Sequence, residues 1–426
     1  MVPRHSGLTL IPLRPSGRYS VFPKSISAVA DMYPNLPSHP DGRAKMAAVR
    51  VTSREPCVRL ELARWALGAW LLWRVPRPRP VPVGGPPRQR RATSVVVPAR
   101  NEEANIAALV ASLVAQCPPP AQVLVVDDGS TDATARLARA AGADVLAAGP
   151  VPNGWTGKAW ACARGAEATV GEVLAFLDAD TVLAPGGLER LLAELAAQGW
   201  RGLVSVQPFH VTLRPYERLS AFFNLVGPMG TGAFTPLAGW RGVVGAFGPC
   251  LVCDRTDYEA AGGHACVRGN VLDDAALARH FALAGLPVRL LGGRDTVSFR
   301  MYPAGFAQLA EGWTKNMASG AAIARPLTLV LVVAWLSGAI SAVRYAVLAG
   351  MGRCRRGPAA GLYLAYVAQL EWMLRRVGSF GALPAVAFPV PMTFFLAIFA
   401  RSVVLTALRG QVRWKGRMIP IRPVAR

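Results

Sequence analysis

The chain has 426 residues, 52% of them hydrophobic, and a formal net charge of +22 from 47 Lys and Arg against 25 Asp and Glu. Its mean hydropathy of +0.30 is high for a purely soluble protein, and the apolar excess lies after residue 326, which points to membrane segments. The basic runs flank apolar stretches and have no interleaved aromatic residues. We therefore expect anionic lipid head groups as partners and no nucleic acid.

The first part of the chain predicts an extension, a helix and a linker. Residues 1–45 are rich in Pro, Ser and Arg and resemble no signal peptide, so we expect a disordered or non-native N-terminal extension. Residues 57–74 predict a membrane-associated helix, because ALGAWLLW (66–73) is short for a full span but carries Trp anchors. A basic, Pro-rich linker follows over 75–91.

From residue 92 onward, short apolar runs alternate with amphipathic segments. The expected strands are 94–97, 122–126, 143–148, 173–177 and 203–206. Thr131 or Asp132 is expected to cap the helix that follows the second strand. Strands that alternate with helices in this way predict βαβ units and a mainly parallel α/β sheet with flanking helices.

Three of these strands run into polar clusters, PARNEE (98–103), DDGSTD (127–132) and DAD (178–180). Because ligands of an open parallel sheet bind beyond the carboxyl ends of its strands, the clusters should meet at one edge. Asp178 and Asp180 could both reach one Mg²⁺ or Mn²⁺, ions that prefer carboxylate and phosphate oxygens. The cation would offset the repulsion between the two carboxylates and neutralise a diphosphate. A DxD by itself could equally be a solvated turn.

A lysine and a cysteine pair offer further candidate sites. Lys158 near the start of a helix would face a diphosphate together with free backbone N–H groups, or would be a solvated loop lysine. Cys250 and Cys253 form a single CxxC without a second pair, so we expect small apolar residues in a buried strand and no zinc site. Seven cysteines without regular spacing indicate reduced thiols and a catalytic part that faces the cytosol.

On SVVVPARNEE, VLVVDDGSTD and FLDADT, residues 92–316 resemble the family 2 glycosyltransferases, inverting enzymes of the GT-A fold. The resemblance implies a nucleoside diphosphate sugar as donor, most simply a UDP-sugar, with Mg²⁺ or Mn²⁺ on Asp178 and Asp180. The residues expected to bind the nucleotide sugar are Pro98, Glu102, Asp127, Asp128, Lys158 and Asp178.

The resemblance also implies a base that takes the proton of the acceptor. In GNVLDDAALARH (269–280), Asp274 stands at the family's base position and Asp273 at the preceding Glu position, where it would orient the base or the acceptor. Both could instead be acids favoured by the dipole of a helix whose apolar face includes Leu277, Phe281 and Ala284.

Two neighbouring motifs are less clear. His264 in the Gly-Gly turn could line an acceptor loop, although a surface or packed histidine is favoured. Processive members of the family carry a Gln-x-x-Arg-Trp motif where this chain keeps only Trp313, with Leu309 and Gly312 in place of Gln and Arg. That departure argues against a processive polysaccharide synthase.

The C-terminal part predicts a membrane region over 322–410 with two to three helices and a basic tail over 411–426. Its apolar stretches are 327–343, 359–370 and 382–400. The first predicts a transmembrane helix, the second is short enough to be re-entrant or interfacial, and the third is long enough to span. WKGR (414–417) is interpreted as an interfacial anchor.

The whole pattern resembles the membrane-bound branch of the family, whose members glycosylate carotenoid, hopanoid or ceramide-type lipids. It implies an integral membrane enzyme that transfers a sugar to a hydroxyl or carboxylate of a lipid. Two alternatives stay open, a polyprenyl-phosphate sugar synthase and a non-catalytic membrane protein that binds nucleotides. A Rossmann oxidoreductase is disfavoured because no GxGxxG follows the first strand.

Overall fold

The computed structural model describes residues 11–12, 19–20, 58–81, 91–238, 245–270, 272–320, 326–409, 411–414 and 417–420. The chain divides into two compact units, Met1–Ser53 and Arg54–Arg426. In the first unit, β1 (Ile11–Pro12) pairs antiparallel with β2 (Tyr19–Ser20). Most of the predicted N-terminal extension and much of the predicted linker lie outside the described residues.

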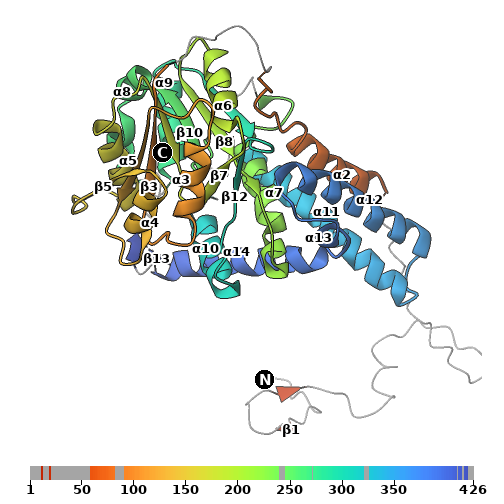
Figure 1. The fold of residues 1–426 in the computed structure, drawn as a ribbon. Coiled ribbons are helices and arrows are strands. Elements are labelled where there is room, and N and C mark those ends of the chain that lie inside the picture. Colours follow the sequence, from red (N-terminus) through yellow and green to blue (C-terminus); the bar gives the residue numbers. More distant parts are fainter. Residues whose placement is uncertain are drawn as a thin grey trace, which may run out of the picture. The chain divides into compact units, whose positions relative to one another are not determined.

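The second unit carries the remaining elements (Figure 1). In chain order they are α2 (Val58–Leu71), β3 (Thr93–Ala99), α3 (Ile106–Val114), β4 (Gln122–Asp127), α4 (Thr134–Ala140), β5 (Asp144–Ala147), α5 (Gly157–Glu167), β6 (Val173–Leu177), β7 (Thr181–Leu183), α6 (Gly187–Ala196), β8 (Leu203–Gln207), β9 (Phe209–His210), η1 (Pro215–Ser220), α7 (Ala221–Thr231), β10 (Cys250–Asp254), α8 (Arg255–Ala260), η3 (Gly263–Val267), α9 (Asp273–Leu283), β11 (Val288–Gly292), β12 (Val297–Phe299), α10 (Phe306–Gly320), α11 (Pro326–Gly350), α12 (Arg356–Val377), α13 (Leu383–Val386), α14 (Pro389–Arg409), β13 (Gln411–Trp414) and β14 (Arg417–Pro420).

A seven-stranded sheet in the order β11-β8-β10-β6-β3-β4-β5 forms the centre of the α/β domain. Strand β10 runs antiparallel to its neighbours β6 and β8, and the other adjacent strands are parallel. The predicted mainly parallel α/β sheet is therefore confirmed. The antiparallel β10 contains the buried, unpaired thiols of Cys250 and Cys253, as expected for a core strand.

Helices cover both faces of the sheet, which explains why its strands are apolar at almost every position. Val95 and Val97 of β3 belong to one hydrophobic cluster together with α3 and α6. Val96, between them, belongs to a second cluster together with α5 and α9. Side chains of a strand alternate between faces, so each of these valines is buried under one helical layer.

The ends of two helices differ from the prediction. Helix α4 begins at Thr134 with Ala133 as its N-cap residue, so neither Thr131 nor Asp132 is the cap. The Asp132 carboxylate still accepts the Thr134 N–H at 3.0 Å, and so satisfies one of the free donors of this helix. Helix α9 ends at Leu283, which leaves Ala284 exposed beyond the apolar face expected to include it.

Residues before and after the α/β domain form one helical bundle, in which α2, α11 and α12 lie side by side (Figure 1). Buried polar groups tie the three helices together. Trp65 of α2 donates to the Ala365 carbonyl at 3.0 Å, and Gln369 of α12 donates to the Trp65 carbonyl at 2.7 Å. Trp335 of α11 donates to Gln369 at 2.8 Å, so a single amide side chain bridges all three helices.

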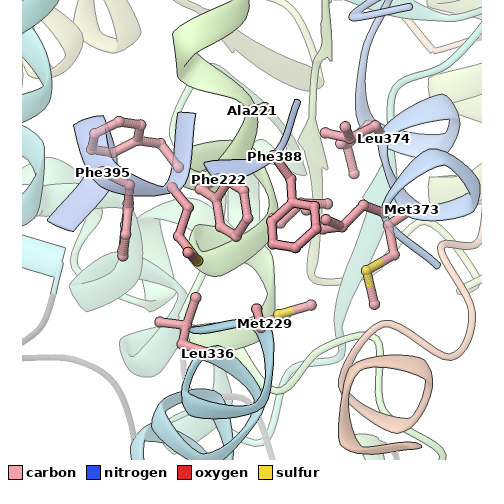
Figure 2. Close-up of a cluster of buried hydrophobic side chains, with 14 of the residues drawn as sticks. Ala221, Phe222, Met229, Leu336, Met373, Leu374, Phe388 and Phe395 are labelled. Carbon is pink, nitrogen blue, oxygen red and sulfur yellow. The ribbon is translucent and has the colours of Figure 1, made fainter. Parts of the chain in front are cut away.

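A cluster of buried side chains joins this bundle to α7 and to α14, which runs along the underside of the α/β domain (Figures 1 and 2). Phe222 of α7 lies at its centre, with Leu336 of α11 and Phe388, which precedes α14, close by (Figure 2). The rings of Phe222 and Trp335 stack with centroids 6.0 Å apart. The bundle therefore shares one apolar core with α7, α10 and α14.

Two helices in the described part of the chain are long and apolar enough to cross a membrane, Pro326–Gly350 with a mean hydropathy of 2.0 and Pro389–Thr406 with 1.6. A buried helix of a soluble protein can also meet these criteria of length and composition. Helix α12 has 22 residues, longer than the apolar stretch predicted at 359–370. The stretch predicted at 382–400 is divided between α13 and α14. The centre of WKGR lies outside the described residues.

Candidate active site

The three polar clusters predicted from the sequence follow three neighbouring parallel strands, β6, β3 and β4. In this register Ala99 at the end of β3 lies opposite Asp127 at the end of β4, and Val96 of β3 lies opposite Phe176 of β6. The strands therefore end at the same edge of the sheet. Asp178 is the first residue beyond β6, so the three clusters share this edge as expected.

A cavity at this edge gathers residues from β3, α5, the end of β6 and α9. Five of the predicted site residues line it, together with one histidine: Pro98, Lys158, Asp178, His264, Asp273 and Asp274. The Lys158 ammonium thus shares a cavity with three carboxylates, one from the end of β6 and two from the start of α9. Such a concentration of ionisable groups in a concave site is typical of catalytic centres.

Lys158 and Asp178 form the closest ion pair of the cavity, with Lys158 Nζ 2.7 Å from Asp178 Oδ1. Lys158 is in the first turn of α5, whose N-cap Thr156 accepts the Ala159 N–H. Burial lowers the pKa of Lys158, but Asp178, Asp273 and Asp274 raise it by more, so its pKa lies well above the ordinary value. The ammonium therefore stays charged.

Asp273 and Asp274 are the first two residues of α9. Burial and the neighbouring charge of Asp273 raise the pKa of Asp274 to about 6, although Lys158 acts in the opposite direction. Asp273 is 4% exposed and its Oδ2 has no hydrogen-bond partner among the described residues. A carboxyl group with a pKa near neutrality is suited to exchange protons with a substrate.

Gly248 leaves the room that the Asp274 side chain occupies. A Cβ at position 248 would lie 2.6 Å from Asp274 Oδ2 and 2.9 Å from its Cγ. Because the sequence predicts Asp274 as the base, we expect Gly248→Ala to displace this carboxylate and to lower kcat by roughly 100-fold, the usual effect of a small displacement of a reacting group. Steady-state kinetics would measure this, with Gly227→Ala as control, where a Cβ meets no atom. Equal kcat values for the two variants would contradict the placement of Asp274.

The acids at the end of β4 lie at the same edge but do not line the cavity. Asp127 accepts the Ser130 N–H at 3.0 Å, which shapes the turn after the strand. Asp128 is buried and its Oδ2 lies 3.6 Å from Arg100 Nη1. Burial raises the pKa of Asp128, Arg100 lowers it and Asp127 raises it, with a net increase. Glu102 accepts a hydrogen bond from Asn105 at 3.0 Å in the adjoining loop.

Asp180 is two residues beyond Asp178, between β6 and β7, and it does not line the cavity either. Its carbonyl accepts the Arg300 N–H at 3.4 Å, and its charge together with burial raises the pKa of Tyr302. Arg300 is fixed in turn by the buried Glu217, 2.7 Å from its Nη2. The described residues contain no group of three or more side chains that could ligate a metal. The DxD therefore offers two carboxylates and no complete cage.

The structure explains the departure from the processive motif in α10. Trp313 is buried, stacks on Phe223 with centroids 4.4 Å apart and donates to Ser220 at 2.9 Å. A Cβ on Gly312 would clash with the ring of Tyr302, so this position has no space for the arginine of processive enzymes. Trp313 therefore serves the helical core and does not line the cavity.

His264 is the cavity residue that sequence reasoning did not favour. It is 2% exposed and lines the cavity beside the acidic pair of α9. Its ring also packs against Phe176 of β6, with centroids 4.7 Å apart. The only signal for it in the sequence is the Gly-Gly turn directly before it, near the expected acceptor loop.

Known proteins are similar to this chain in sequence. Residues 94–236 match the family model described as glycosyl transferase family 2. The chain is 39% identical over 334 residues to 4,4'-diaponeurosporenoate glycosyltransferase of Staphylococcus aureus (strain USA300), an alignment that covers 78% of this chain and 89% of that protein. The protein of the same name from strain MRSA252 matches with the same identity and coverage.

Two solved structures are also similar. Mannosyltransferase PcManGT from Pyrobaculum calidifontis, in complex with GDP-Man and Mn²⁺, gives a TM-score of 0.48 at 19% identity, over 82% of this chain and 95% of that chain. Glucosyl-3-phosphoglycerate synthase from Mycobacterium tuberculosis, in complex with Mg²⁺ and UDP, gives 0.37 at 23% identity, over 54% and 79%. At these TM-scores the two structures add nothing to the sequence match.

Proposed function

Because this chain belongs to glycosyltransferase family 2, we propose that it moves a sugar from a nucleoside diphosphate sugar to a lipid acceptor at a membrane. The observation that carries the proposal is the cavity in which Lys158 and Asp178 face Asp273 and Asp274. The named substrate of the staphylococcal relative, 4,4'-diaponeurosporenoate, supports an extended apolar acceptor.

The donor would lie along the carboxyl edge of the sheet. Asp127 and Asp128 at the end of β4 would hold the nucleoside, with Pro98 and Glu102 on the adjoining β3 side. Lys158 would face the diphosphate, supported by the free N–H groups at the start of α5. UDP is the nucleotide we favour. Asp178 pairs with Lys158 at 2.7 Å, so the diphosphate would share the lysine with this carboxylate.

Asp178 and Asp180 would hold Mg²⁺ or Mn²⁺ together with the donor. Both ions take carboxylate oxygens and readily share phosphate oxygens, so two protein carboxylates fit the ion once a diphosphate completes its ligands. Oδ1 of Asp178 lies 2.7 Å from Lys158 Nζ, so the ion would share this carboxylate with the lysine. When bound, the ion would neutralise the charge that develops on the leaving diphosphate.

Asp274 would act as the base when the acceptor is a hydroxyl, and Asp273 would orient the base or the acceptor. The acceptor would attack the anomeric carbon on the side opposite the leaving diphosphate, so the sugar would be transferred with inversion. A carboxylate acceptor is already ionised near neutral pH and needs no base. The acceptor class therefore decides how much of the rate depends on Asp274.

The helical bundle and α14 would hold the enzyme in the membrane. Large apolar side chains are exposed on three helices, for example Leu62 of α2, Val330 of α11 and Val403 of α14, each more than half exposed. Exposed apolar surface of this extent marks a membrane or protein contact. Arg353 in the exposed turn between α11 and α12 and Arg356 at the start of α12 suit anionic head groups.

We propose that the catalytic domain faces the cytoplasm. None of the six cysteines in the described part of the chain forms a disulfide, which suits a reducing compartment.

One assay tests the proposal. Membranes from cells that express the chain are incubated with UDP-glucose, UDP-galactose, UDP-N-acetylglucosamine or GDP-mannose, with and without Mn²⁺, and the extracted lipids are identified by mass. We expect one donor to add its sugar to a membrane lipid in the presence of Mn²⁺, and membranes from cells that do not express the chain serve as the control.

Failure of every donor to label a lipid would contradict the proposal. A product whose sugar is released by mild acid as a phosphodiester would instead identify a polyprenyl-phosphate acceptor.

A further inference from the structure

Tyr258 and His264 form a buried pair behind the cavity. Tyr258 lies on α8, and its hydroxyl accepts the backbone N–H of His264 at 3.0 Å and lies 2.9 Å from His264 Nδ1. Gly263 makes this contact possible, because a Cβ there would lie 2.8 to 3.0 Å from the Tyr258 ring and hydroxyl. Its φ of +53° also favours glycine. The Gly-Gly turn thus fixes the imidazole ring on the phenol.

The pair defines which ring nitrogen carries the proton. Burial, and to a smaller extent the charge of Lys158, lower the pKa of His264 to about 3, so the ring is neutral at physiological pH. The buried hydroxyl of Tyr258 already accepts the backbone N–H, and Nδ1 is its only acceptor among the described residues. The phenol hydrogen therefore points to Nδ1, and the proton of the neutral imidazole lies on Nε2.

Besides the His264 Nε2–H donor, the cavity contains a hydrogen-bond acceptor that has no partner among the described residues. His264 lies on η3, which packs between α5 and α9, the helices that carry Lys158 and Asp273. Asp273 lines the same cavity, and its Oδ2 is buried without a hydrogen-bond partner among the described residues. A buried polar atom without a partner is costly unless a ligand satisfies it.

From this juxtaposition we infer that His264 Nε2–H and the Asp273 carboxylate together bind one hydroxyl group of the sugar that is transferred. The hydroxyl accepts from the imidazole and donates to the carboxylate, which satisfies both protein groups at once. The sugar is the part of the donor that must lie between the diphosphate at Lys158 and the base at Asp274. The inference rests on the proposed function and makes His264 a residue that sets sugar specificity.

The test compares donors that carry or lack single hydroxyl groups. The probes are the four nucleotide sugars of the membrane assay and their monodeoxy derivatives, and the natural donor that the wild-type protein uses fastest defines the series. For one deoxy position we expect the wild-type kcat/KM to fall by at least about 100-fold, because a missing hydroxyl leaves two buried groups unpaired. In His264→Leu the ratio of kcat/KM for the natural donor to kcat/KM for the same deoxy donor should shrink to about tenfold or less.

A matched pair of amide variants separates the hydrogen bond from packing. The His264→Gln amide N–H can reach the position of Nε2, so this variant should keep most of the discrimination, whereas the shorter His264→Asn should lose it. Each ratio is taken within one variant, so the fraction of folded protein cancels.

Equal ratios in the wild type and His264→Leu would overturn the inference while sugar transfer itself stands. Absence of transfer by the wild-type protein would instead refute the proposed function, so the two failures are distinguishable.

Discussion

Asp274→Asn is expected to keep donor binding and to lower kcat for transfer to a lipid alcohol by about 10²–10⁴-fold, the usual contribution of a general base. Asparagine matches the shape of aspartate but cannot take a proton. Transfer kinetics and calorimetric titration of UDP would measure the two effects separately. Asp144→Asn on the exposed strand β5 is the matched control, and its kinetics should stay unchanged.

The pH profile provides a second measure of the same group. Since the pKa of Asp274 is raised to about 6 by burial and by Asp273, the base is protonated below that pH. Wild-type kcat/KM should therefore rise with pH through about 6 and level off above it, and Asp274→Asn should lack this step. An Asn variant that transfers to an alcohol at the wild-type rate would exclude Asp274 as the base.

Comparison of two acceptors distinguishes the classes of acceptor that the proposal allows. A lipid alcohol must lose its proton, whereas a lipid acid of the same chain arrives ionised. The Asp274→Asn variant should therefore lose far more activity towards the alcohol than towards the acid. Equal losses for both acceptors would show that Asp274 acts by another route than proton removal.

Asp180→Asn is expected to reduce turnover severely, by roughly 10²–10³-fold at fixed Mn²⁺, because one of two protein ligands of the ion loses its charge. The variant should still sediment with membranes, since it leaves the exposed apolar side chains of α2, α11 and α14 unchanged. Turnover as a function of Mn²⁺ concentration would measure the change.

Asp295→Asn is the control for the metal experiment. Asp295 is exposed, pairs with Arg77 at 3.4 Å and has a φ of +64°, a conformation that asparagine tolerates. We expect its Mn²⁺ dependence to match the wild type. Wild-type turnover and Mn²⁺ dependence in Asp180→Asn would remove the metal assignment.

Much of the sheet and of its polar edge could be predicted from the sequence. Val95, Val96 and Val97 form a β-branched run that is buried on both faces, and the polar residues after β3, β4 and β6 mark where these strands end. Parallel strands bring their carboxyl ends together, so the common edge follows from the order of the elements.

The rest depends on contacts that local pattern does not encode. The run that contains Cys250 predicts a buried strand, but nothing in it indicates that β10 lies antiparallel between β6 and β8. His264 reaches the cavity because Gly263 lets the Tyr258 ring approach the turn, a packing relation that only the fold reveals. Trp65 and Gln369 meet across some 300 positions, so the bundle of α2 with α11 and α12 could not be read from either segment alone.

The most direct test of the account is a structure of the protein with Mn²⁺ and the nucleotide of its donor. We predict anomalous density for Mn²⁺ at Asp178 and Asp180, a diphosphate beside Lys158, and the sugar-bearing end directed at Asp274. A nucleotide bound away from this cavity, or Mn²⁺ bound at other residues, would contradict the claim that these acids form one donor site.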